Sequence, residues 1–185
     1  MSKFATPPVG KLPNLWYTVD MAGTKKLITG EFSRTVDDRF RLSLPDEFKD
    51  VFKPESGKCV IVKEKPGHLS LWDENTWMRE YDQRIKMVQE RYTMGYLADK
   101  MVDVKRFGRL LSALYRHVQL AERGRLSLPE GFREFLAVEP KQDVMVIGAF
   151  HCIEIWHPQK WIEYAKEDIP QFGDLMESLL NNRTT

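Results

Sequence analysis

The sequence RFRLSLP occupies residues 39–45, and the nearly identical sequence RGRLSLP occupies residues 123–129, an offset of 84 residues. At the same offset and without a gap, a phenylalanine and four of the five tryptophans also match: Phe48 with Phe132, Trp72 with Trp156, and Trp77 with Trp161. Rare residues that match at one fixed spacing indicate an internal duplication. Because two copies are too few for a solenoid, the sequence predicts a pseudo-symmetric pair of half-domains.

Polar and apolar residues alternate in the repeated stretch, as they do in a half-buried strand. Leu42 and Leu44 are therefore expected to face a core, with Arg41 and Ser43 facing outward, and residues 125–128 repeat the pattern. The proline that follows each strand, with acidic residues after it, suits the first turn of a short helix. The paired tryptophans lie at strand-to-helix junctions, where core packing is a better interpretation than base stacking.

The bulk composition describes a chain that can fold but carries little net charge. The 185 residues are 42% hydrophobic, and the formal net charge is +1, so any DNA binding must come from a local patch. Neither of the two cysteines belongs to a CxxC pair, which argues against a zinc ribbon and a disulfide scaffold. No signal peptide and no apolar run of about 18 residues is found, so we expect a cytoplasmic protein without a membrane partner.

Charge is polarised along the chain. Residues 99–125 hold seven basic and three acidic residues, whereas residues 154–185 hold three basic and six acidic residues. Local positive charge is what phosphate binding requires, because neutralising phosphates releases counterions. His151, Cys152 and His157 form no repeated ligand set, and no phosphate-cradling or nucleophile motif occurs. We therefore expect no metal, no cofactor and no enzymatic activity.

The repeated unit resembles a known DNA-binding half-domain. An Asp-x-x-x-Arg turn, then Leu-Ser-Leu-Pro and a short phenylalanine-containing helix, is similar to the SpoVT/AbrB unit. Two tandem copies, each followed by a strand that ends near a tryptophan and by a helix, resemble the MraZ family over about residues 30–166. The resemblance implies an α+β fold in which two tandem AbrB-like swapped-hairpin half-domains, built of antiparallel strands and short helices, form one pseudo-symmetric unit.

The expected organisation has five segments. They are a flexible N-terminal arm at residues 1–29, a first SpoVT/AbrB-like repeat at 30–76, connecting helices at 77–113, a second repeat at 114–160, and a C-terminal helix and tail at 161–185. Gly95 is expected to separate two connecting helices. In the second of them, apolar residues can line one face: Val102, Phe107, Leu110, Leu111 and Leu114.

The resemblance also implies a function. MraZ proteins form ring-shaped homo-oligomers, localise to the cytoplasm and nucleoid, and bind short direct repeats in the promoter of their own division and cell-wall operon, usually as repressors. By position, the residues that contact double-stranded DNA would be the turn arginines Arg39, Arg41, Arg123 and Arg125. An arginine suits this role because its planar fork matches phosphate oxygens and the guanine edge.

Three residues are expected to shape the two turns: Asp37, Phe40 and Gly124. Each turn departs from the family pattern, because Phe40 stands where the family has glycine and Ala121 stands where it has aspartate. Phenylalanine tolerates a positive φ poorly, so the first turn is expected to differ in shape from the second.

These departures leave a second hypothesis open, in which the chain is an oligomeric protein-interaction scaffold without specific DNA binding. Residues 30–50, with six acidic and four basic residues, favour it. The arginines themselves could be surface ion pairs, for example between Arg41 and Asp37, rather than DNA contacts. A single-repeat antitoxin is disfavoured because the unit is duplicated here.

Overall fold

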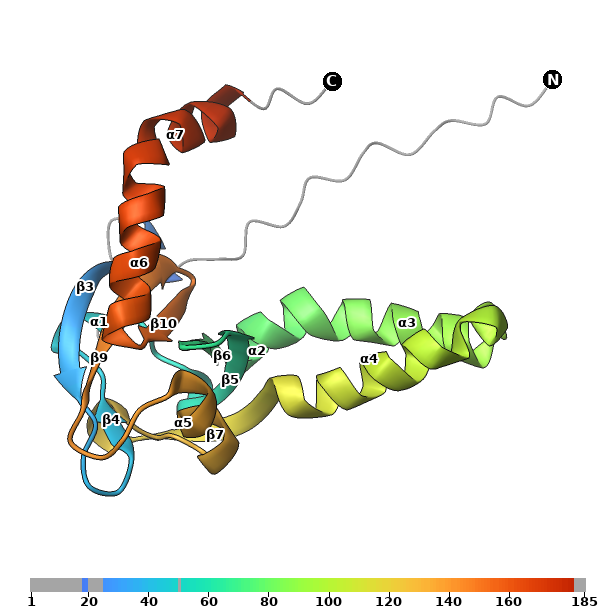
Figure 1. The fold of residues 1–185 in the computed structure, drawn as a ribbon, viewed down its shortest axis with the longest axis horizontal. Coiled ribbons are helices and arrows are strands. Elements are labelled where there is room, and N and C mark those ends of the chain that lie inside the picture. The colour runs from blue at the N-terminus through green and yellow to red at the C-terminus, as the bar shows by residue number, and fades with distance from the viewer. Residues whose placement is uncertain (1–17, 20–24, 50, 182–185) are drawn as a thin grey trace.

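The structure is a computed structural model that describes residues 18–19, 25–49 and 51–181 (Figure 1). Its strands are β1 (Thr18–Val19), β2 (Lys25–Lys26), β3 (Ile28–Thr35), β4 (Arg41–Ser43), β5 (Lys58–Lys65), β6 (His68–Asp73), β7 (Tyr115–Ala121), β8 (Arg125–Ser127), β9 (Asp143–Phe150) and β10 (Cys152–Trp156). Its α-helices are α1 (Asp46–Lys49), α2 (Glu74–Trp77), α3 (Gln83–Thr93), α4 (Met101–Leu114), α5 (Glu130–Leu136), α6 (Pro158–Asp168) and α7 (Phe172–Asn181). A π-helical segment, Met78–Asp82, joins α2 to α3, and short 3-10 turns lie at Glu55–Gly57, Ala98–Lys100, Glu122–Gly124 and Ile169–Gln171.

Eight strands form one antiparallel sheet in the order β3-β9-β10-β6-β5-β7-β8-β4, while β1 and β2 pair separately. The two sequence copies exchange strands in this sheet. The first strand of copy one, β3, pairs with β9 of copy two, and β7 of copy two pairs with β5 of copy one. At the centre, β6 and β10 pair so that Leu69 lies opposite Ile155 and Leu71 opposite Ile153. These four residues are equivalent at the offset of 84, so an approximate two-fold axis passes between the copies.

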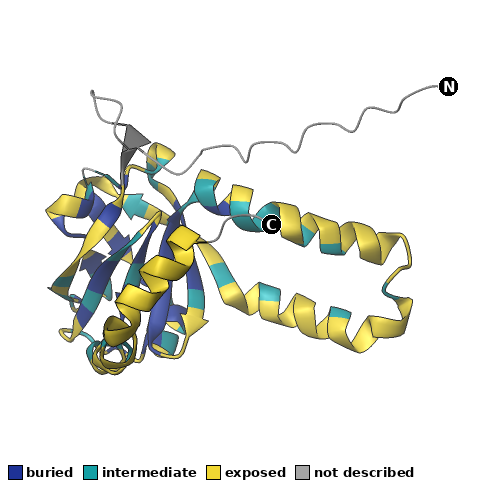
Figure 2. Cartoon of the chain, turned by 90° about the horizontal axis from the view of Figure 1, so that it is seen from above, coloured by how far each residue is buried: buried dark blue, intermediate teal, exposed yellow. Residues whose placement is uncertain are grey.

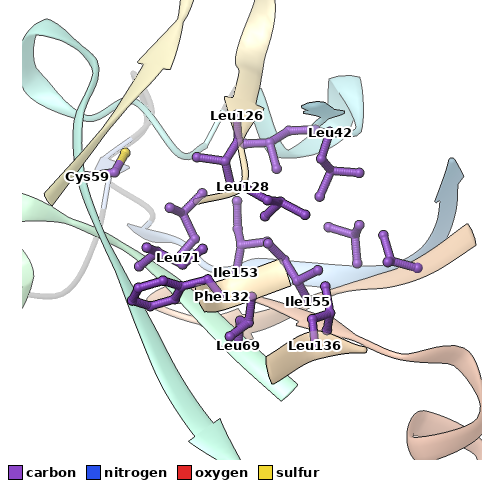
Figure 3. Close-up of a cluster of buried hydrophobic side chains, with 14 of the residues drawn as sticks. Leu42, Cys59, Leu69, Leu71, Leu126, Leu128, Phe132, Leu136, Ile153 and Ile155 are labelled. Carbon is purple, nitrogen blue, oxygen red and sulfur yellow. The ribbon is translucent and has the colours of Figure 1, made fainter. Parts of the chain in front are cut away.

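Both copies contribute to one central hydrophobic core. Figure 3 shows Leu42 beside Leu126 and Leu128, with Ile153 and Ile155 below them. Leu42 and Leu126 are register partners across β4 and β8, and neither is exposed to solvent. The four leucines predicted to face inward are all buried, with exposed fractions of 0–4% (Leu42, Leu44, Leu126, Leu128). The prediction of an α+β fold with swapped hairpins is therefore confirmed, and neither copy has a core of its own.

The tryptophans support the core, as predicted, although unequally. Trp72, Trp77 and Trp156 are buried, whereas Trp161 is half-buried and donates its indole N–H to Glu31 at 2.9 Å. Trp72 and Trp77 belong to a second apolar cluster at the base of the connecting helices, together with Val60, Val62 and Cys152. This cluster anchors the helical segment to the sheet.

The connecting segment forms a helical hairpin that projects away from the sheet (Figures 1 and 2). Its two long helices, α3 and α4, are separated around Gly95, which has a φ of 79°. The predicted apolar face of α4 does not become core, because Val102 is 80% exposed and Leu110 58% exposed. Helices α6 and α7 leave the sheet in another direction.

Most of the expected N-terminal arm lies outside the described residues. Within the described part of it, β1 and β2 form a two-residue pairing. Strand β3 begins at Ile28, two residues before the expected start of the first repeat at residue 30, and Ile28 is buried in the central core.

Candidate nucleic-acid interface

The repeated stretches meet in a two-stranded ribbon formed by β4 and β8. Arg41 pairs with Ser127, and Ser43 pairs with Arg125, on either side of the central leucine pair. Because successive side chains of a strand point to opposite faces, these four residues share the face opposite the buried leucines. Ser43, Arg125 and Ser127 are exposed, and Arg41 is half-buried. The ribbon therefore presents two diagonally placed arginines and two serines to solvent.

The turn before β4, here called turn 1 (residues 37–41), is organised by Asp37. One carboxylate oxygen accepts hydrogen bonds from the backbone N–H of Arg39 at 2.8 Å and of Arg41 at 2.9 Å. The other accepts from Nε of Arg41 at 2.7 Å, which is also an ion pair. Phe40 adopts the left-handed conformation, with φ of 55°. Arg41 is thus oriented by an acidic neighbour, as the ion-pair interpretation anticipated.

The turn before β8, here called turn 2 (residues 121–125), has no such carboxylate. Ala121 occupies the position of Asp37, and both Arg123 and Gly124 have positive φ, 65° and 70°. The two turns therefore differ in shape because turn 2 has two left-handed residues where turn 1 has one, although Phe40 does adopt the conformation that its side chain disfavours. Among the described residues, neither Arg123 nor Arg125 forms a side-chain hydrogen bond or ion pair.

Each turn is tied to the strand of the other copy by the backbone. The N–H of Leu44 donates to the carbonyl of Gly124 at 2.9 Å, and the N–H of Leu128 donates to the carbonyl of Phe40, also at 2.9 Å. The two bonds are related by the offset of 84, so the approximate two-fold symmetry extends to the turns. Both turns are consequently fixed relative to each other by the same short ribbon.

The charge of Asp37 is maintained by turn 1. Desolvation acts to raise the pKa of this carboxyl, but the backbone hydrogen bonds of Arg41 and Arg39 and the charge of Arg41 outweigh it, so the pKa lies below the usual 3.8. Because the pKa is lower in the folded state than in the unfolded state, the ionised carboxylate stabilises turn 1 at pH values above the unfolded-state pKa. This contribution is lost only as pH falls through the lower, folded-state value.

We therefore expect turn 1 to keep its hydrogen bonds throughout the neutral and mildly acidic range. In a pH titration followed by NMR, the amide proton of Arg41 should shift with an apparent pKa below 3.8. An Asp37→Asn variant should lack this titration. A midpoint at or above 3.8 in the parent chain would show that the carboxylate is not held by the turn in solution.

The described residues contain neither a helix that could span a membrane nor a cluster of side chains that could hold a metal. No helix described here has both the length and the apolar character that crossing a bilayer requires. In the same part of the chain, no three His, Cys, Asp or Glu side chains gather in a way that could hold a metal ion.

Comparison with known proteins places the chain among bacterial regulators. The family model for the MraZ protein, described as antitoxin-like, matches residues 116–180. The chain is 28% identical over 156 residues to the transcriptional regulator MraZ of Moorella thermoacetica, covering 84% of this chain and 98% of the relative. Against the Treponema denticola protein of the same name, identity is 26% over 152 residues, covering 82% and 96%. The chain is therefore similar to MraZ proteins over most of its length.

The MraZ relatives carry the name of transcriptional regulators, which agrees with the prediction that the chain is not an enzyme. A solved structure, that of PHS018 from Pyrococcus horikoshii, covers 72% of this chain and is itself 97% covered, with 12% identity and a TM-score of 0.31.

Two basic residues near the turns were not singled out by the sequence. The helices that follow β4 and β8 carry Lys49 and Arg133, which are equivalent at the offset of 84. Arg133 lies over the ring of Phe40, with 4.0 Å between the guanidinium carbon and the ring centroid. Lys49 lies against the opposite turn, at Gly124. The offset pairs these two residues, but only the folded chain reveals that each reaches the turn of the other copy.

Proposed function

We propose that this chain is a sequence-specific DNA-binding regulator of transcription that represses its own division and cell-wall operon. The observation that carries the proposal is the outer face of the β4–β8 ribbon, where Arg41 and Arg125 are displayed with two serines. A two-stranded ribbon fits the major groove of B-DNA, which is about 12 Å wide. Arginine can bind a guanine edge or a phosphate with two parallel hydrogen bonds, and serine can bind either.

The local charge supports turn 2 as the stronger of the two contact points. Arg123 and Arg125 are exposed, and no carboxylate among the described residues pairs with them. Turn 1 offers less free positive charge, because Asp37 binds Arg41. A nearly neutral chain can then bind DNA through a few well-placed arginines rather than through a broad basic surface. We assign Arg39 and Arg41 to the same contact as weaker members.

We further propose that copies of the chain assemble into a ring, in the cytoplasm and on the nucleoid, and that each copy reads one short direct repeat. Helix α7 supports assembly, because its apolar residues recur at the spacing of one helix face and remain 48–76% exposed: Phe172, Leu175, Met176, Leu179 and Leu180. A stripe of this size on a terminal helix indicates an interaction surface.

The occupant that we propose for the α7 stripe is helix α4 of a second copy. Helix α4 exposes Val102 and Leu110, and basic residues adjoin them (Lys105, Arg106, Arg109). Helix α7 carries the opposite charge, with Asp174 and Glu177 and no basic residue. Figure 1 shows the two helices projecting from the sheet in different directions. A contact between two different surfaces is heterologous, and such contacts generate rings when the rotation closes.

The test is fluorescence anisotropy of the full chain on labelled DNA from its own upstream region, with scrambled DNA of equal length as the control. Measurements at two salt concentrations separate phosphate contacts from other contributions, because each neutralised phosphate steepens the salt dependence. We expect tighter binding to upstream DNA, weakening with salt.

A second candidate function has support of its own. Because Arg41 forms an ion pair with Asp37, its guanidinium is less available to bind DNA, and the sequence around turn 1 is acidic. An oligomer that shows no preference for upstream over scrambled DNA would overturn the regulator proposal and favour a protein-interaction scaffold.

A further inference from the structure

The helices that follow the ribbon strands each place a basic side chain on the turn of the other copy. Lys49 ends α1 of copy one and contacts turn 2, whereas Arg133 lies in α5 of copy two and contacts turn 1. The two residues are equivalent in the repeat, and so are the two turn residues that they contact, Gly124 and Phe40. The arrangement is therefore symmetric in position, although the residue types differ.

Arg133 is held by stacking and not by an acid. Its guanidinium carbon lies 4.0 Å from the centroid of the Phe40 ring, and its side chain is half-buried. Among the described residues it has no ion pair. A stacked guanidinium uses its flat face for the cation–π contact, which leaves the N–H donors along its edge available to an anion. This arginine is oriented and still has donors to offer.

Lys49 differs in both respects. Its ammonium forms an ion pair with Asp46 at 2.7 Å, which neutralises its charge locally. Its aliphatic carbons fill the space over Gly124, where an added Cβ would lie 2.7 Å from Cε. A side chain at position 124 would therefore displace Lys49. With glycine at position 124, turn 2 has no aromatic ring over which a cation could lie.

The difference between the two turns indicates a role for Phe40, which has a left-handed backbone. Its left-handed backbone is a strained conformation for a residue with a Cβ, and such strain persists only when the surroundings hold it. Here the ring packs against the core on one side and carries Arg133. Phe40 thereby orients a cation at turn 1, where Arg41 is already bound by Asp37.

We propose that Arg133 is a further phosphate-binding residue of the DNA interface, oriented by Phe40, so that the two turns present different sets of cations to DNA. The inference rests on the proposed function, because it assumes that the ribbon faces DNA. The ligand is a backbone phosphate, since the helix carrying Arg133 flanks the ribbon and the ribbon itself supplies the residues for base edges.

The experiment is the salt dependence of binding to a duplex that holds a single repeat, measured by anisotropy for Arg133→Met, with Lys49→Met as the matched control. Loss of one phosphate contact should reduce the slope of log K against log salt by about 0.9 and weaken binding about 3- to 10-fold at moderate salt. Lys49→Met should leave the slope unchanged, because Asp46 already neutralises that charge. Arg133→Lys should restore most of the slope, which a purely structural role would not predict.

The role of Phe40 is tested by a double-mutant cycle. Phe40→Gly should reduce the slope in the parent chain but have no further effect in the Arg133→Met background. Circular dichroism of each variant checks that the fold is kept. An unchanged slope in Arg133→Met, while Arg125→Ala still weakens binding, would overturn this inference alone. A parent chain that ignores its upstream DNA would overturn the proposed function and this inference together.

Discussion

A chain with both Leu175→Asp and Leu179→Asp should be monomeric and should lose most of its affinity for DNA that holds several repeats. Both leucines are exposed on α7, at 56% and 71%, so the change should not unfold the protein. It places charge in the stripe that we propose to pack against a second copy. Linked binding sites exceed the affinity of one site by about 10²- to 10⁴-fold, and this gain requires the assembly. Affinity for a single repeat should stay within about 2-fold, because α7 lies away from the ribbon.

The matched control carries Ser178→Asp and Asn181→Asp, which add the same charge to the polar side of the same helix. Analytical ultracentrifugation should show an intact assembly for this control and monomers for the leucine variant. If the leucine variant remains assembled, α7 is not the contact. If it becomes monomeric and still binds multiple repeats as tightly as the parent chain, avidity does not explain the affinity.

The proposed contact between α7 and α4 can be tested separately from assembly itself. Val102→Asp together with Leu110→Asp on α4 should also weaken assembly, because both side chains are exposed and belong to the proposed contact. Mixing this variant with the α7 variant should give dimers, since one intact α7 and one intact α4 remain in each pair. Failure of the mixture to pair would place the α4 contact elsewhere.

The sequence predicted the two strands of the ribbon, although not their pairing with each other, because the alternation within each strand is local and repeated. The alternation of polar and apolar residues at 41–44 is sufficient to predict that Leu42 lies in the core and Arg41 outside it. The same pattern in the second copy supports this prediction independently. The paired tryptophans predicted junction packing for the same reason. The exchange of strands between the copies could not be predicted from local patterns, because β3 pairs with β9 across more than 100 residues of sequence.

The site was less predictable than the fold. The ion pair of Asp37 with Arg41 lies within one turn and could be anticipated from spacing. The stacking of Arg133 on Phe40 could not, since it depends on how the two copies dock. Helix α4 has the apolar periodicity that the sequence predicted. Because the hairpin projects from the sheet, however, Val102 on this helix faces solvent and not the core. Periodicity identifies an apolar face without revealing what covers it.

The arginines of the ribbon give the second large expected effect. Arg125→Ala should weaken binding to upstream DNA by about 10- to 100-fold, because a bidentate arginine–base contact contributes about 1–3 kcal/mol of discrimination. Arg41→Ala should have a smaller effect, since Asp37 already binds that side chain. The double variant should approach the affinity for scrambled DNA. Thermal unfolding should change little, because Arg125 is exposed and forms no ion pair within the described residues.

Arg125→Lys distinguishes the two kinds of contact that this side chain could make. Lysine keeps the positive charge but lacks the planar fork, so a phosphate contact would survive and a guanine contact would not. We expect the variant to retain the salt dependence of the parent chain and to lose its preference for upstream over scrambled DNA. Arg91→Ala, on α3 and away from the ribbon, serves as the control for a lost surface charge. Unchanged affinity in Arg41→Ala, in Arg125→Ala and in the double variant would exclude the ribbon arginines from the DNA interface.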